Sequence, residues 1–523
     1  MSEKSKNVNR NVNLVGALTG FSRVLGLVRE MMTSRLIGAG VEQSAFVFAF
    51  TIPNLFRKLF GEGALSSAFV PVFSEEVEHG RLEAAEKIAR AVSSMVFMLL
   101  GTICVTGILA FSAALPFLDD GGRIATTLRL TRIMLPYAVL ICVTAFAMGM
   151  LNVFGKFGKA AFAPAILNGV WIVTLMGLFF FPELSLYARV EIVSWSVLLS
   201  GLLQMVYLLR AVKRHGMTLK LTFRNWRDGK VLTVWRNTFI GALGMGAVQI
   251  NLILDNTLAL WAAPWAPAAI SYAERLVYLP LGVVATAFAT VLLPTLSGAF
   301  AKGDLVGARK TMMESTEDVL LLTLPAAVGL MLLSTDITKV VYQGGEFTAA
   351  ETEHVARALM CYAPGLLVFS LNKILLPWFY AQKDMKTPLI TGLYMVGANA
   401  FLNVLLVITL PLGWKHAGIA GSTVVCALGS SLLLVWKAQR VNGHMGFIKL
   451  ADSTVRMAGA AILMGAVVVA TKYEVSSWMG TGRLAGLVTI LIAVAASLVV
   501  YGVAVWRLCP VASRRILMTY AKR

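Results

Sequence analysis

Long apolar segments alternate along this chain with short polar linkers. About 20 apolar residues suffice for a helix to cross a bilayer. Such a segment must be a helix in lipid, because an open strand would leave backbone groups without hydrogen bonds. The pattern predicts an all-α polytopic membrane protein with fourteen transmembrane helices, at 13–38, 43–73, 91–114, 126–154, 161–181, 187–209, 238–262, 268–300, 319–333, 355–380, 388–410, 418–436, 454–470 and 484–505.

Composition agrees with this pattern. The chain has 523 residues, of which 58% are hydrophobic and only 14% charged, too apolar for a soluble protein of this length. The net charge of +19 comes from basic residues in short linkers rather than on one helix face or in an aromatic groove. This distribution favours the positive-inside rule over nucleic-acid binding, so we expect a membrane partner and no nucleic acid.

The basic linkers predict the orientation of the chain. Cations concentrate in alternate linkers, near 81–90, 156–159, 210–236, 302–310, 383–386 and 437–449. These linkers should be cytoplasmic. With an even number of helices and a basic tail at 511–523, both termini are then expected in the cytoplasm.

The long basic linker at 213–236 divides the first twelve helices into two pseudo-symmetric six-helix bundles, 1–212 and 237–440. Two extra helices follow at 450–510. The halves share a pattern of proline, serine, glycine, leucine and lysine, at Pro71, Ser74, Gly80, Leu82 and Lys87 and at Pro294, Ser297, Gly303, Leu305 and Lys310. A second parallel links Pro164 with Pro388. Parallel repeats are typical of transporters that work by alternating access, although shared ancestry alone would also produce them.

Several ionisable residues lie inside the apolar segments. Each costs on the order of 2.5–3.5 kcal/mol at bilayer depth, so it normally faces a partner or a watery cavity. Cations exceed acids, and guanidinium groups suit a phosphate or diphosphate ligand. The residues are Arg23, Arg29, Arg57, Lys58, Glu62, Glu274, Arg275 and Lys373. Alternatively, the two acids neutralise neighbouring arginines and terminal cations extend to the headgroups. The nearby glycines Gly26, Gly61 and Gly63 indicate helix bends or close helix packing.

A second polar group combines Asp255, Asn399, Asn403 and Thr423. Asn399 and Asn403 are four residues apart and share one helix face. Carboxylate, amide and hydroxyl oxygens are ligands suited to Na⁺. A buried hydrogen-bond network in the second bundle explains the same residues equally well.

No catalytic apparatus is visible in the sequence. The five histidines are scattered, no GxxxxGK[ST] motif is present, and the five cysteines are isolated. The longest outer linker, 334–354, contains Asp336 and Glu346 without a paired-acid motif. The N-terminus does not have the features of a removed signal peptide. We therefore expect a transporter rather than an enzyme, with no cofactor except a candidate Na⁺.

Three motifs carry a resemblance to a known family: FSRVLGLVRE at 21–30, PNLFRKLFGEGALSSAFVP at 53–71 and YQGGEFT at 342–348. With these, the chain resembles the lipid II flippases of the MurJ/MviN type, in the multidrug/oligosaccharidyl-lipid/polysaccharide exporter superfamily. The resemblance implies a V-shaped pair of six-helix bundles in the bacterial cytoplasmic (inner) membrane. It also implies movement of the undecaprenyl-diphosphate-linked peptidoglycan precursor from the inner to the outer leaflet. We expect a monomer, with cell-wall synthesis proteins as candidate partners.

The resemblance also implies site residues. The diphosphate would be bound by Arg23, Arg29, Arg57 and Arg275, with the cavity supported by Ser22, Gly26, Lys58, Glu62 and Lys373. The two C-terminal helices, at 454–505, would form a groove for the polyprenyl tail, and the second polar group would be a sodium site. Two positions depart from the family pattern: Ser44 replaces a frequent Asp, and Lys58 replaces a frequent Arg.

Three alternatives remain open. A cation-coupled drug exporter of the same superfamily would favour acids over arginines in the first bundle. A membrane glycosyltransferase that uses a polyprenyl-diphosphate sugar would need an essential outer carboxylate, such as Asp336 or Glu346. A scaffold for division or envelope proteins is the third.

Overall fold

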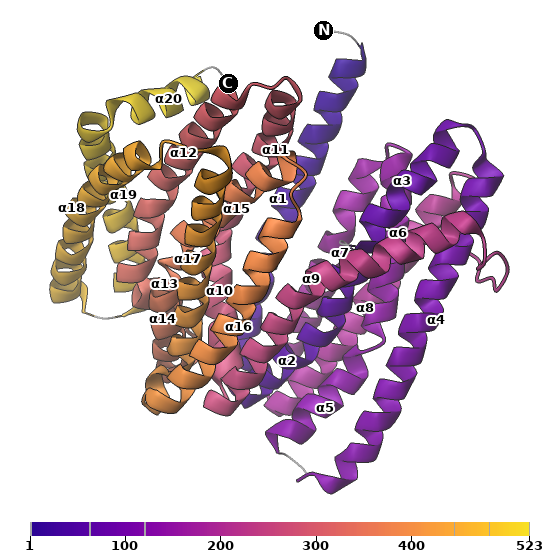
Figure 1. Ribbon diagram of the computed structural model, residues 1–523. Coiled ribbons are helices and arrows are strands. Elements are labelled where there is room, and N and C mark those ends of the chain that lie inside the picture. Colours follow the sequence, from indigo (N-terminus) through magenta and orange to yellow (C-terminus); the bar gives the residue numbers. More distant parts are fainter. Residues whose placement is uncertain (1–2, 62–63, 120–121, 444, 481, 522–523) are drawn as a thin grey trace. The chain divides into compact units, whose positions relative to one another are not determined.

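The computed structural model describes residues 3–61, 64–119, 122–443, 445–480 and 482–521 and is almost entirely helical (Figure 1). No strand occurs among these residues, and the isolated β-bridge between Gly344 and Phe347 is the only pairing of that kind in them. The all-α prediction is confirmed. In the described part, 9 helices are long and apolar enough to cross a membrane, or up to 11 if each of two bent pairs is one span. The protein is a multi-pass membrane protein, and the count of fourteen stays a prediction.

The chain forms two compact units, 1–256 with 344–347, and 257–343 with 348–523. The first contains α1 (Glu3–Ile37), α2 (Val41–Phe56), η1 (Arg57–Gly61), α3 (Ala64–Glu78), α4 (Leu82–Ala114), η2 (Leu115–Phe117), α5 (Arg123–Met134), α6 (Tyr137–Val153), α7 (Phe157–Leu178), α8 (Leu186–Lys213) and most of α9 (Gly229–Ala262). The second contains the end of α9, α10 (Ala266–Val283), α11 (Ala285–Ala301), α12 (Leu305–Leu332), α13 (Ser334–Val341), α14 (Ala349–Tyr362), α15 (Gly365–Ala381), α16 (Lys386–Thr409), η3 (Leu412–Trp414), α17 (Lys415–Asn442), α18 (Phe447–Met479), α19 (Arg483–Leu508) and α20 (Pro510–Ala521).

The boundary between the units lies inside α9 and not in the predicted linker at 213–236. Val231 and Val234, near the start of α9, are fully buried in the core of the first unit. Their burial keeps this end of the helix with the first unit.

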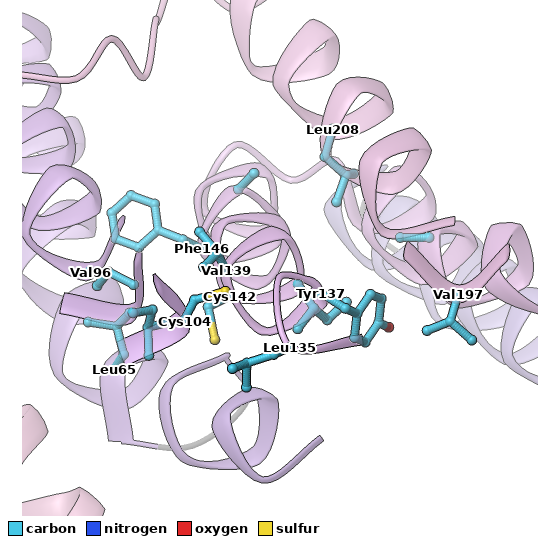
Figure 2. Packing of buried hydrophobic residues seen from close by; sticks show 14 of the residues in the cluster. Leu65, Val96, Cys104, Leu135, Tyr137, Val139, Cys142, Phe146, Val197 and Leu208 are labelled. Atoms are coloured by element: carbon cyan, nitrogen blue, oxygen red, sulfur yellow. The ribbon is translucent and has the colours of Figure 1, made fainter. Parts of the chain in front are cut away.

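The core of the first unit surrounds α6. This helix is apolar on every face and most of its residues are buried, as expected for a helix enclosed by others. Figure 2 shows side chains from α3, α4, α6 and α8 in this core. The rings of Phe69 and Phe146 lie 4.1 Å apart between centroids.

In the second unit, α18 and α19 pack against each other and α18 packs along α12. Buried residues of all three helices, among them Leu321, Met464 and Tyr501, form one hydrophobic cluster. The Tyr501 hydroxyl donates a hydrogen bond to the Leu321 carbonyl at 2.9 Å. The two helices predicted outside the repeat are therefore part of the second compact unit.

The sequence pattern matches certain helix ends of the first half with helix ends of the second half. In the structure, the matched ends have the same backbone geometry. After α3 and α11, Gly80 and Gly303 have φ values of 73° and 72°. The next residues, Arg81 and Asp304, donate their amides to the carbonyls five positions earlier, at 2.9 Å and 3.0 Å. This is the Schellman motif, which needs a left-handed residue and so favours glycine.

The second pair of ends, after α6 and α15, repeats this motif. Gly155 and Lys383 have φ values of 71° and 62°. Lys156 and Asp384 donate to carbonyls five positions earlier, at 2.8 Å and 2.9 Å. Four equivalent helix ends support the internal repeat seen in the sequence.

The second predicted span, 43–73, is interrupted in the structure. Pro53 lies inside α2 and cannot donate a helical hydrogen bond. A π-helical turn, η1, follows and contains Arg57 and Lys58. Such turns often occur at functional sites. Glu62 and Gly63 lie outside the described residues.

Candidate functional site

Arg29 is buried at the contact between α1 and α7, with 7% of its surface exposed. One guanidinium nitrogen donates to Asn168 Oδ1 at 2.9 Å, and another forms an ion pair with Glu30. The guanidinium carbon also lies 4.4 Å from the centre of the Trp171 ring, a cation–π distance. The charge of Arg29 is therefore neutralised and solvated by protein groups inside the first unit.

Asn168 connects α7 to a single face of α1. Its amide nitrogen donates to the Ser22 carbonyl at 2.9 Å and to the Ser22 hydroxyl at 3.3 Å. A Cβ at Gly26 would lie 3.8 Å from the same nitrogen. Ser22, Gly26 and Arg29 are spaced by four and three residues, so they lie on one helix face.

Arg23 belongs to a different face of α1, and its side chain is exposed. Six residues of helix separate it from Arg29, which turns the two side chains about 120° apart. The two arginines that the sequence assigns to one cavity therefore have different surroundings in the structure. Arg23 is accessible, whereas Arg29 is enclosed by Asn168, Glu30 and Trp171.

Arg57 and Lys58 lie on the η1 turn and are half-buried. Arg57 Nε donates to Asn54 Oδ1 at 2.8 Å, which fixes one edge of the guanidinium.

In the second unit, Arg275 is an exposed residue of α10 and Lys373 a half-buried residue of α15. The two helices pack against each other. The neighbour of Lys373, Asn372, donates to the Ala427 carbonyl at 3.0 Å and links α15 to α17.

The polar group of the second unit is a hydrogen-bonded network between α16 and α17. Asn403 donates to Asn399 Oδ1 at 3.0 Å, and the Asn399 amide donates to the hydroxyls of Ser422 and Thr423 at 3.4 Å and 3.5 Å. The Ser422 hydroxyl donates to Asn403. Ser422 was not among the predicted residues, although it precedes Thr423 directly.

Asp255, the carboxylate assigned to the same group, lies in the first unit, where Asn251 donates to it at 3.0 Å. Among the described residues, no group of three or more His, Cys, Asp or Glu side chains could hold a metal ion.

Arg189, at the start of α8, is a buried cation that the sequence analysis did not single out. It is 6% exposed and donates to the carbonyls of Leu36 and Pro182 at 2.9 Å and 2.6 Å. It also forms an ion pair with Glu346 at 3.0 Å. These contacts tie the 344–347 turn to the first unit.

This turn needs a glycine at position 345, because a side chain would not fit there. Gly345 has a φ of 59°, and a Cβ there would lie 2.2 Å from the Arg35 carbonyl oxygen. The same carbonyl accepts the amide of Glu346 at 2.9 Å.

The linker at 334–354, which the sequence predicts to lie outside, is not an open loop, because α13 and the 344–347 turn occupy most of it. The second outer acid, Asp336, pairs with Lys472 at 2.9 Å. Both outer carboxylates considered for catalysis are therefore engaged in ion pairs.

A groove of about 670 Å³ runs along one face of α18. Its lining repeats every three or four residues and includes Ile462, Ala466 and Ala470, with Leu332 from α12. Tyr473 and Glu474 line one end of the groove. The groove is almost wholly apolar and lies within the predicted tail-binding segment.

The family model described as lipid II flippase MurJ matches residues 33–504 of this chain. A "Probable lipid II flippase MurJ" from Rhizobium tropici is 35% identical over 475 residues, covering 90% of this chain and 88% of that protein. A "Lipid II flippase MurJ" from Burkholderia cenocepacia is 33% identical over 436 residues, covering 82% of this chain and 83% of that protein.

Solved structures share the fold. The inward closed conformation of a lipid II flippase MurJ aligns with a TM-score of 0.75 and 22% identity, covering 94% of this chain and 99% of that chain. An inward-facing multidrug transporter of the MATE family aligns with a TM-score of 0.65 and 16% identity, covering 80% and 94%.

Proposed function

This chain belongs to the lipid II flippase MurJ family, and from that membership we propose that it moves lipid II across the bacterial cytoplasmic membrane. It is a transporter and not an enzyme. The observation that carries the proposal is the match over 33–504, which begins after Arg23 and Arg29 but includes Arg57 of η1 and Arg275 of α10. In proteoliposomes, the purified protein should move lipid II between leaflets, and vesicles without protein should not.

We propose that Arg23, Arg57 and Arg275, with Lys58 and Lys373, bind the diphosphate. A guanidinium stays charged when desolvated and offers two parallel hydrogen bonds to phosphate oxygens. Arg29, with Ser22 and Gly26, positions α1 against α7 in this conformation, because both terminal nitrogens of its guanidinium already bind protein groups. Glu62 completes the proposed set from outside the described residues.

We propose transport by alternating access, in which these cations are exposed to the two leaflets in turn. The fold supports this mechanism, since the solved relatives include inward-facing and outward-facing transporters. Moving one elementary charge through 100 mV contributes about 2.3 kcal/mol, so the membrane potential can bias the charged complex.

We propose that the α18 groove holds the polyprenyl tail. Ala466→Trp fills this apolar groove, so it should lower lipid II flipping at least about tenfold and leave the amount of inserted protein unchanged. The measurement is the flipping rate in proteoliposomes. Leu463→Trp, on an exposed neighbour that does not line the groove, is the control and should flip at the wild-type rate. Equal rates in all three proteins would refute the tail assignment.

We propose Na⁺ as the coupling ion, with Asp255 as its charged ligand and Asn399, Asn403 and Thr423 as the neutral ones. Replacing K⁺ by Na⁺ outside the vesicles should change the flipping rate of the wild type but not of Asp255→Asn. Glu183→Gln, an exposed acid of the first unit, is the control and should keep the sodium response. If the flipping rate of Asp255→Asn responds to Na⁺ like that of the wild type, the sodium proposal fails. The hydrogen-bond network alone then explains these residues.

We propose that both termini are cytoplasmic, with fourteen spans arranged as two six-helix bundles and two further helices. The distribution of basic linkers supports this orientation. In a chain without native cysteines, a membrane-impermeant maleimide added to intact cells should label Glu183→Cys and should not label Arg224→Cys. The reverse labelling would invert the topology.

We further propose that the protein works as a monomer beside cell-wall synthesis proteins. A flippase incorporated at one copy per vesicle should retain full activity under the monomer proposal.

A drug exporter is the second candidate function, because the multidrug transporters share this fold. Active drug efflux without lipid II flipping would favour it.

A further inference from the structure

A pocket of about 390 Å³ lies at one end of α7 and α8 in the first unit, next to the basic linkers predicted to be cytoplasmic. Its cationic lining consists of Lys159, Arg210 and Arg214. The remaining lining is apolar or aromatic, from Leu203, Val206, Tyr207 and Ala211. None of these residues belongs to the proposed diphosphate site.

The three cations have no ion pair and no side-chain hydrogen bond within the described ranges. Arg210 and Arg214 are one helical turn apart, so their side chains lie on the same face of α8. Lys159 reaches the pocket from the first turn of α7. Their donors are therefore free to bind a common anion.

The surroundings of the pocket are electropositive. His215 follows directly after Arg214, beyond the end of α8. Burial of its ring, and then the charges of Lys156 and Lys159, hold the pKa of His215 below its usual range. A positive charge on the histidine is thus disfavoured where the cations gather.

The apolar side of the pocket continues along α8 toward the opposite end of the helix. Residues at spacings of three or four, Leu203, Leu199, Trp195 and Ile192, are all exposed on this face. From Leu203 to Ile192 the stripe is about 16 Å long, at about 1.5 Å per residue. The stripe lies within a helix long and apolar enough to cross a membrane, so its exposed side chains are expected to face lipid.

We propose that this pocket binds an anionic phospholipid of the cytoplasmic leaflet. Its phosphate lies among Lys159, Arg210 and Arg214, and one acyl chain lies along the exposed stripe of α8. Basic pockets between transmembrane helices on the cytoplasmic side recognise anionic headgroups. A free phosphate would use the cations alone and leave the continuous apolar stripe without a role.

The test uses the purified full chain, depleted of lipid in a neutral detergent and titrated with phosphatidylglycerol or with zwitterionic phosphatidylcholine. Lipid retained by the intact protein is counted by mass spectrometry. The triple variant Lys159→Gln/Arg210→Gln/Arg214→Gln removes the pocket charge. The charge-matched control is Lys213→Gln/Lys220→Gln/Arg224→Gln, three exposed cations that do not line the pocket.

The wild type and the control should retain phosphatidylglycerol in preference to phosphatidylcholine. At about 1 kcal/mol per cation near a headgroup, the pocket variant should bind phosphatidylglycerol on the order of a hundredfold more weakly. Equal loss in the control, or no loss in the pocket variant, would overturn the proposal. Displacement of the lipid by millimolar inorganic phosphate, or by equimolar lipid II, would assign the pocket to those ligands and overturn it too.

Discussion

We expect Arg57→Ala and Arg23→Ala each to reduce lipid II flipping at least about a hundredfold in proteoliposomes. A hydrogen bond to a charged group contributes about 1.5–3 kcal/mol, and a guanidinium that holds a diphosphate with two such bonds loses both on truncation. Neither side chain is part of the core, because Arg23 is exposed and Arg57 only half-buried. The amount of inserted protein should therefore equal that of the wild type.

Two variants make this result specific. Arg456→Ala is the matched control, because Arg456 also lies in a predicted span but is exposed and paired with Asp452 at 2.7 Å. It should flip at the wild-type rate. Arg57→Lys keeps the charge but not the planar fork, so its rate should lie between those of the wild type and Arg57→Ala. If Arg57→Ala flips lipid II at the wild-type rate, η1 is not part of the substrate site.

The second large effect concerns the buried pair of Arg29 and Glu30. Arg29→Met removes the ion-pair partner of the buried Glu30 carboxylate, which should lower the free energy of unfolding by about 3–5 kcal/mol. The double variant Arg29→Met/Glu30→Met removes both charges, and its stability should return close to that of the wild type. The measurement is the thermal unfolding midpoint of the purified protein in detergent.

The flipping rate of the double variant distinguishes between two candidate roles of Arg29. If Arg29 positions α1 against α7, as its contacts with Asn168 and Trp171 indicate, the double variant should recover part of the flipping that Arg29→Met loses. If Arg29 binds the diphosphate directly, flipping stays absent although stability returns. A double variant as unstable as Arg29→Met would contradict the buried-pair description itself.

The sequence was sufficient to predict an all-helical membrane protein, and it indicates an internal repeat, because both inferences depend on local patterns. Apolar length alone predicts spans. The glycine that ends α3 and the one that ends α11 recur at matching positions, and the structure gives both the same left-handed turn. Charged residues inside apolar segments likewise showed where a site could be, since their cost needs no structure to estimate.

The partners of those charges could not be predicted in the same way. Asn168 and Trp171 lie about 140 positions after Arg29 in the sequence, and only the packing register of α7 on α1 brings them together. One signal was available in the sequence. The spacing places Ser22, Gly26 and Arg29 on one helix face and Arg23 on another. Arg189 gave no comparable signal, because an arginine at a helix start ordinarily extends to the headgroups.

The most direct test of the central claim is depletion of this protein in living cells, followed by measurement of lipid II on each face of the cytoplasmic membrane. The account predicts that lipid II accumulates on the cytoplasmic face, and that wild-type protein but not Arg57→Ala reverses the accumulation. An unchanged distribution of lipid II after depletion, in cells without a second flippase, would contradict it.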